Sequence, residues 1–256
     1  MRTLVSAELL KLRSTRSAWI PLVVALGFAV LAVIVNTTAA GRNGNPPLSA
    51  GMLPDLLRGS GGKLVDGAVL LGWIVLSAGE FRHRTSVTTF LGEPRRLRVV
   101  SAKLVAAVLT GLAVGLAAEA LSAVASGVAL SAQHVPLHWG DPAVASTIVA
   151  VPLLAALHGV LGVGLGLLLR NTAAALGVAL MWAFVIEGVL PAVLGEPGLT
   201  RWLLGGTADA FLGGAASTAT TLSAGAALAV LTAYAAVLAV GGAAVTRGRE
   251  VGTATG

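Results

Sequence analysis

The chain contains no cysteine, which excludes disulfide bonds and thiolate metal sites. Charged residues are also scarce: they make up 11% of the 256 residues, against about 25% in a typical soluble domain. Hydrophobic residues reach 56%, and the mean hydropathy is +0.89. This composition excludes an ordinary soluble globular protein and indicates an integral membrane protein.

Motifs for hydrolytic chemistry are missing as well. The stretch GSGGK at 59–63 resembles half of a phosphate-binding loop, but Leu57 and Leu64 stand where the motif needs Gly and Ser or Thr. There is no HExxH zinc motif and no GxSxG nucleophile motif. A proline separates His134 from His138, so the pair does not share a helical turn that could hold a metal. We therefore expect no enzymatic activity, catalytic residue, cofactor or metal in this chain, and we expect 59–63 to be a flexible loop.

Long hydrophobic runs fill most of the remaining sequence. A helix needs about 20 such residues to cross the hydrocarbon core of a bilayer. We predict an all-α, polytopic membrane protein with a single domain over residues 1–256. The six predicted transmembrane helices cover residues 18–40, 64–79, 104–131, 144–169, 173–195 and 222–245. The predicted loops between them cover 41–63, 80–103, 132–143, 170–172 and 196–221.

Lys and Arg are distributed unevenly in this topology. With six spans, both termini share a side with loop 80–103 and Arg170, and that side holds thirteen of the 17 basic residues. Because cytoplasmic loops carry an excess of Lys and Arg, we predict that both termini and this loop are cytoplasmic. The basic start also fits a signal peptide, but the hydrophobic run that follows is too long for one and is followed by further spans.

Residues 1–17, ahead of the first span, have a helical pattern. Val5, Leu9 and Leu12 share one face, while Glu8 and Lys11 share a polar face. This pattern predicts a helix that lies in the membrane interface.

Small residues on the third and fourth predicted spans have the spacing of closely packed helices. Gly111 and Gly115 are four residues apart, as are Gly162 and Gly166. Lipid tails give helices no hydrophobic reason to associate, so small residues that let backbones approach favour contact. We expect both pairs to lie in helix–helix interfaces.

Glu119, His158 and Glu187 are ionisable residues within the predicted spans. Glu119 shares a helix face with Gly115 and Ser122, which directs it into the bundle, and a carboxylate at this depth is costly unless protonated or paired. His158 would lie at a similar depth, so a Glu119–His158 contact is one hypothesis. Each of the three can either line a translocation path or satisfy an interhelical hydrogen bond, which is the simpler interpretation.

The stretch GEFRHRTSVTTFLGEPRRLRVVSAK, residues 79–103, holds six basic residues between two hydrophobic spans. A short helix over about 85–92 would have Val87, Phe90 and Leu91 on one side, and the following proline would end it. Such an amphipathic turn ringed by Arg can lie on anionic headgroups or insert into the groove of a cytoplasmic partner.

The pattern GEFRHRT…TTFL…PRR…AK after the second of six spans resembles permeases of ATP-binding-cassette transporters of the type-2 exporter class. It is most similar to the small permeases abundant in actinobacteria. The opening AELLKLRSTRSAW and the fifth-span WAFVIEGVLP, residues 182–191, are similar to the same family. The likeness covers essentially the whole chain, and its motifs identify the class of protein but no substrate.

The resemblance implies roles for individual segments. Residues 1–17 would be a connecting helix, 80–103 would hold a coupling helix that docks into a separate ATP-binding subunit, and 196–221 would form short helices dipping back from the outer face. The residues implied to transmit the motion are Glu80, Phe81, Arg82, Arg84, Val87, Phe90, Leu91 and Arg95. A second copy or a related permease would complete twelve spans in a bacterial cytoplasmic membrane. ATP and Mg would bind to the partner subunit, and no nucleic-acid partner is expected.

The expected function is therefore that of the membrane-spanning subunit of an ATP-driven exporter for an amphipathic or hydrophobic substrate. Two alternatives stay open. The chain can be a non-transporting assembly or immunity factor that binds a partner through the same loop, or a proton-coupled carrier that uses Glu119 and Glu187.

Overall fold

The computed structural model describes residues 1–42, 44–49, 51–61, 63–82, 95–194, 197–213 and 222–248. All regular structure within these ranges is helical, as predicted. Among the described residues, six helical segments are long and apolar enough to cross a membrane. They run over Arg16–Ala39, Leu53–Arg82, Arg96–Ala132, Pro142–Leu169, Thr172–Leu194 and Ala224–Gly248. The prediction of a six-span membrane protein is confirmed at this level.

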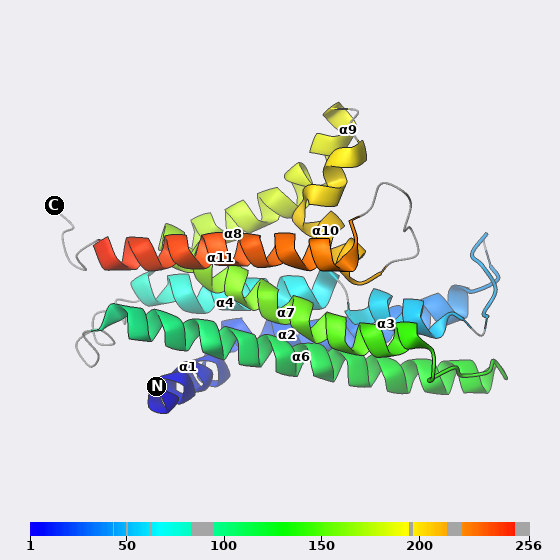
Figure 1. Ribbon diagram of the computed structural model, residues 1–256. Coiled ribbons are helices and arrows are strands. Elements are labelled where there is room, and N and C mark those ends of the chain that lie inside the picture. The colour runs from blue at the N-terminus through cyan, green and yellow to red at the C-terminus, as the bar shows by residue number, and fades with distance from the viewer. Residues whose placement is uncertain are drawn as a thin grey trace.

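The spans form an elongated bundle in which the N-terminal helix α1 (Arg2–Ser14) and the last turn of α11 (Ala224–Gly248) lie at the same end (Figure 1). We call it the basic end, because most of the described Lys and Arg residues are there, and we call the other the opposite end. The further elements that begin or finish at the basic end are α2 (Arg16–Ala39), α4 (Lys63–Arg82), α6 (Arg96–Ala132) and α7 (Pro142–Leu169). An even number of spans accounts for both termini being at one end.

Helix α7 is the centre of the bundle and packs against α4, α6 and α11. Its limits follow from local sequence. Pro142 occupies the first turn, where a missing N–H costs nothing, and the Asp141 side chain accepts a 2.8 Å hydrogen bond from the Ala143 N–H. The helix ends at Arg170, which adopts the left-handed conformation with φ of 54°. The predicted span over 144–169 and the tight turn after it are confirmed.

Glycines bring α7 close to its neighbours, as their spacing predicts. A Cβ atom added at Gly111 would lie 2.5 Å from the Ala156 Cα, and one at Gly115 would lie 2.5 Å from the Pro152 Cα. Gly162 on α7 likewise faces the backbone of α4. These positions have no room for a larger side chain, so both predicted glycine pairs lie in helix interfaces.

The predicted loop over 41–63 contains a helix, α3 (Leu53–Gly61), so the prediction of a flexible loop is wrong for residues 59–61. Three leucines of α3 are buried against Leu130 and Val144. Asp55 and Arg58 on the remaining face form an ion pair at 3.1 Å. A nine-residue amphipathic helix is too short to register as a hydrophobic span, which is why the search for long apolar runs missed it.

The predicted loop over 80–103 is shorter than expected at both ends. Helix α4 continues to Arg82, and α6 begins at Arg96 rather than at 104. Basic side chains interrupt the apolar run but not the helix, because their aliphatic stems can cover apolar surface while the charged ends reach polar surroundings. Only residues 83–95 separate the two helices.

The fifth span changes direction before the opposite end. Helix α8 (Thr172–Met181) passes into a π-helical turn, η1 (Trp182–Ile186), and then into the short α9 (Leu190–Leu194), which points away from the bundle (Figure 1). A π-turn and a proline are common causes of such bends, and Pro191 is the second residue of α9.

Two short helices follow, as the resemblance implies for 196–221: η2 (Pro197–Trp202) and α10 (Leu204–Phe211). Ala208 and Leu212 pack against Leu154 of α7 and Leu231 of α11. Because those two partners lie within spans, α10 folds back into the bundle.

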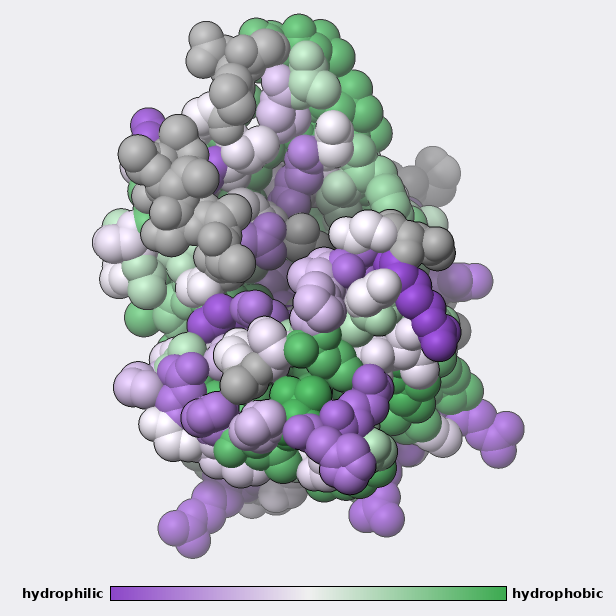
Figure 2. Space-filling model, turned by 90° about the vertical axis from the view of Figure 1, so that its right-hand side faces the viewer, coloured by the Kyte–Doolittle hydropathy of each residue, from purple (hydrophilic) through white to green (hydrophobic). Residues whose placement is uncertain are grey.

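Many large apolar side chains face outward along the spans, including Phe28 and Val149. In a membrane protein this surface faces lipid or other helices, whereas a soluble protein rarely exposes so much contiguous apolar area. Figure 2 looks onto the opposite end, where hydrophilic side chains surround a smaller hydrophobic area. An apolar belt between polar ends is the surface expected of a helical bundle that crosses a bilayer.

Candidate functional site at the basic end

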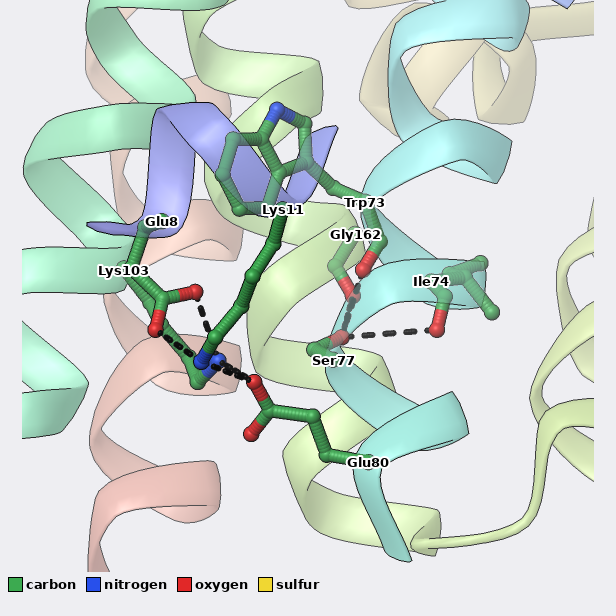
Figure 3. A network of polar contacts seen from close by, with 8 residues as sticks. All are labelled: Glu8, Lys11, Trp73, Ile74, Ser77, Glu80, Lys103 and Gly162. Atoms are coloured by element: carbon green, nitrogen blue, oxygen red, sulfur yellow. Dashed lines mark hydrogen bonds and ion pairs between the residues drawn. The ribbon is translucent and has the colours of Figure 1, made fainter. Parts of the chain in front are cut away.

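Four charged side chains meet at the basic end and connect three helices (Figure 3). Lys103 of α6 donates hydrogen bonds to Glu8 of α1 at 2.7 Å and to Glu80 of α4 at 2.6 Å. Lys11 of α1 bonds the same two carboxylates, each at 2.7 Å. Two ammonium groups and two carboxylates make the cluster neutral, and we call these four residues the charge cluster.

The charge cluster is shielded from solvent on its inner side. The side chain of Lys103 is 3% exposed and that of Lys11 is 34% exposed, while both carboxylates are buried. Burial alone would lower the pKa of the Lys11 ammonium, but Glu80 and Glu8 outweigh it, so this pKa is raised above its ordinary value. The Lys11 ammonium therefore stays charged beside the two carboxylates.

Helix α1 turns its polar face toward the protein. A helix that only lay on the membrane surface would leave that face in water. Glu8 is its most buried residue, and Val5 and Leu9 pack beside it against the core of the bundle. Arg2 and Leu10 remain on the exposed side. The predicted N-terminal helix is confirmed, and it is fastened to α4 and α6 by ion pairs as well as by apolar packing.

A second set of contacts links α4 to the Arg170 turn and links both this turn and α6 to α11. The Arg170 guanidinium lies over the Phe81 ring, 4.9 Å from its centroid, and donates a 2.8 Å hydrogen bond to the Val245 carbonyl. Arg96 at the start of α6 donates a 3.1 Å hydrogen bond to the Thr246 carbonyl. Both acceptors are in the last turn of α11, where carbonyls lack helical partners and cations are favourable.

Of the eight residues implied to transmit motion, four lie in the described part of the chain and four do not. Glu80 and Phe81 lie inside the contacts just described, while Arg82 and Arg95 are exposed at the two ends of the connection between α4 and α6. The other four lie outside the described residues: Arg84, Val87, Phe90 and Leu91.

The predicted contact between Glu119 and His158 is wrong. The His158 Nδ1 atom lies 3.0 Å from the Leu154 carbonyl on its own helix. The antiparallel register seen at Gly111 and Gly115 brings Glu119 opposite a position on α7 about ten residues before His158, or about 15 Å away along the axis. The apolar runs had suggested that Glu119 and His158 lie at equal depth. They do not, because α6 begins at Arg96, ahead of its apolar run.

Glu187 lies at the bend of the fifth span and is fully engaged there. Its carboxylate accepts hydrogen bonds from Trp182 Nε1 at 2.8 Å and from the Gly205 N–H at 2.9 Å. The second donor is in the first turn of α10, where a carboxylate compensates the unpaired N–H groups of a helix. Glu187 thus joins two helical segments by hydrogen bonds, which is the simpler of the two interpretations of this residue.

Three residues at the basic end were not singled out from sequence: Lys103, Arg96 and Arg170. Lys103 was counted among the basic residues of a loop, yet its neighbours VVSA and LVAAV are those of a span. A lone charge between apolar residues needs a buried partner, and this signal was available.

A comparison with known protein families and with curated proteins finds no match to this chain.

Proposed function

We propose that this chain is the membrane-spanning permease subunit of an ATP-binding-cassette exporter in a bacterial cytoplasmic membrane. A separate subunit would hydrolyse ATP, and a second permease copy or a related permease would complete the path. The proposal rests on the resemblance of residues 79–103 to this class. One structural observation supports it: the connection between α4 and α6 is attached at both ends to contacts that reach five helices.

Each end of that connection belongs to a different part of the network. At the α4 end, Glu80 bonds α1 and α6, and Phe81 contacts the Arg170 turn between α7 and α8. At the α6 end, Arg96 bonds the last turn of α11. A force applied to residues 83–95 is therefore distributed over the bundle instead of bending one loop.

Helix α6 gives such a force a route to the opposite end. It is continuous over 37 residues, which corresponds to about 55 Å at 1.5 Å per residue. Close glycine contacts with α7 couple the two helices along this length. Closure of ATP-bound partner subunits could then tilt α6 and α7 together, in the manner of a rigid-body switch.

Co-expression with a nucleotide-hydrolysing subunit of an ATP-binding-cassette transporter, followed by affinity purification of the chain, tests the proposal. Phe90→Asp introduces a charge on the predicted docking side, so we expect loss of co-purification and of ATPase stimulation. Trp139→Asp is the matched control, because Trp139 is 46% exposed in the connection at the opposite end. It should leave co-purification unchanged.

The outcomes also separate the alternatives. Equal recovery of the ATPase with Phe90→Asp would show that this segment is not the docking site. Co-purification without any dependence of ATP turnover on the chain would instead favour an assembly or immunity factor.

A further inference from the structure

One face of α6 carries polar atoms that have no hydrogen-bond partner within the described part of the bundle. Glu119, Ser122 and Ser126 are 3%, 0% and 0% exposed. Both carboxylate oxygens of Glu119 and both serine hydroxyls lack a hydrogen-bond partner among the described residues. At spacings of three and four residues they follow one another along a single side of the helix.

The helices packed against α6 do not bring a counter-charge to Glu119 within the described structure. On α4, Glu80 is held by the charge cluster, and on α3, Arg58 pairs with Asp55. None of the further described ionisable groups on α6 and on the elements packed against it hydrogen-bonds to Glu119. These groups are Arg2, Glu8, Lys11 and Arg13 (α1), Arg16 (α2), Asp66 and Arg82 (α4), Arg96, Arg98 and Lys103 (α6), His158 (α7), and Tyr234 and Arg247 (α11).

An unpaired carboxylate at this depth costs far more than the neutral acid does. A neutral acid must receive its proton from water, and the row of serines leads in one direction only. Ser126 is six residues from the end of α6 at Ala132, or about 9 Å, while Glu119 is 23 residues from Arg96, or about 35 Å. The opposite end of the bundle is therefore the shorter way in.

We propose that Glu119 is a proton-binding site that is filled from the opposite end of the bundle through Ser126 and Ser122. Because the three side chains do not hydrogen-bond to one another, water molecules between them would carry the proton. Each hydroxyl accepts a proton from a water on the side of the opposite end and donates its own proton to a water on the side of Glu119, so no charge is left on the serines. This site is independent of the ATP-binding partner and goes beyond the exporter proposal.

Infrared spectroscopy of the purified chain in lipid nanodiscs tests this directly. The background is Asp66→Asn, because the Oδ1 atom of Asp66 is likewise buried without a partner within the described ranges. At neutral pH we expect a carbonyl band of a protonated carboxylic acid, and Glu119→Gln should remove it. In heavy water this band should shift as the proton exchanges, and Ser122→Ala with Ser126→Ala should slow the shift several-fold.

Two results would overturn the proposal. A band that persists in Glu119→Gln, with size-exclusion behaviour unchanged, would show that Glu119 does not hold the proton. Loss of the band in Glu119→Gln but unaltered exchange in the double serine variant would exclude the serine route. Neither readout involves ATP turnover, so failure here and failure of the exporter proposal are distinguishable.

Discussion

At the scale of single residues, Lys103 makes the most consequential contact at the basic end. It is almost fully buried, and it bonds carboxylates from two other helices. A buried ion pair adds little compared with apolar packing, yet removal of one partner leaves the others as uncompensated buried charges. Lys11 bonds the same carboxylates but is one-third exposed, so water can replace it in part.

Replacement of Lys103 by Met should therefore lower the free energy of unfolding by about 3–5 kcal/mol, while Lys11→Met should cost clearly less. Thermal unfolding of both variants in the same detergent measures the difference. Equal losses for the two would contradict the assignment of Lys103 as the central cation of the cluster.

Residue-level prediction uses local signals, and the coupling role that it assigned to Glu80 and Phe81 stays a prediction. Glu80 and Phe81 were identified from the motif around them, and both make inward contacts. Lys103 and Glu8 were not paired in advance, because 95 residues separate them and a hydrophobicity pattern contains no information about which distant segments meet.

At the scale of elements, all six spans were found from apolar runs, since length and composition alone decide whether a helix can cross a bilayer. Their ends were less predictable. Helix α7 ends where Asp141 and Arg170 set its limits, but α6 starts well before its apolar run because basic residues at the interface do not break a helix. The short α3 and the bend at η1 depend on packing that no run of hydrophobic residues reveals.

The α6–α7 interface gives a prediction for two glycines that differ only in their surroundings. Gly111→Ala must push against the Ala156 backbone, so we expect a loss of about 1–3 kcal/mol in unfolding free energy. Gly27→Ala on α2 meets nothing within 4 Å and should be neutral or stabilising by up to about 1 kcal/mol.

The stabilities of the two variants are compared by heating each one and measuring the fraction of protein that stays monodisperse. A destabilised Gly27→Ala would indicate that the general loss of glycine matters, whereas an unaffected Gly111→Ala would mean that α6 and α7 are not in close contact.

At the scale of the whole molecule, orientation in the membrane follows from charge alone. The basic end should face the cytoplasm, because Lys and Arg are retained there. A chain without cysteine allows a clean test by single substitutions. A membrane-impermeant maleimide should label Trp139→Cys in intact cells, and it should label Arg98→Cys only after permeabilisation.

Labelling of Arg98→Cys from outside in intact cells would reverse the topology. The connection between α4 and α6 would then be out of reach of any ATPase, and the exporter proposal would fall while the helical fold remained unchanged.

The fastening of α1 also has a consequence for the order in which the protein is made. Glu8 leaves the ribosome before Lys103, which follows 95 residues later, within the third span. Until that span has been inserted, the Glu8 carboxylate lacks its buried cation and must remain hydrated. Helix α1 is thus translated before Lys103 but reaches its final packing only after the third span has been inserted.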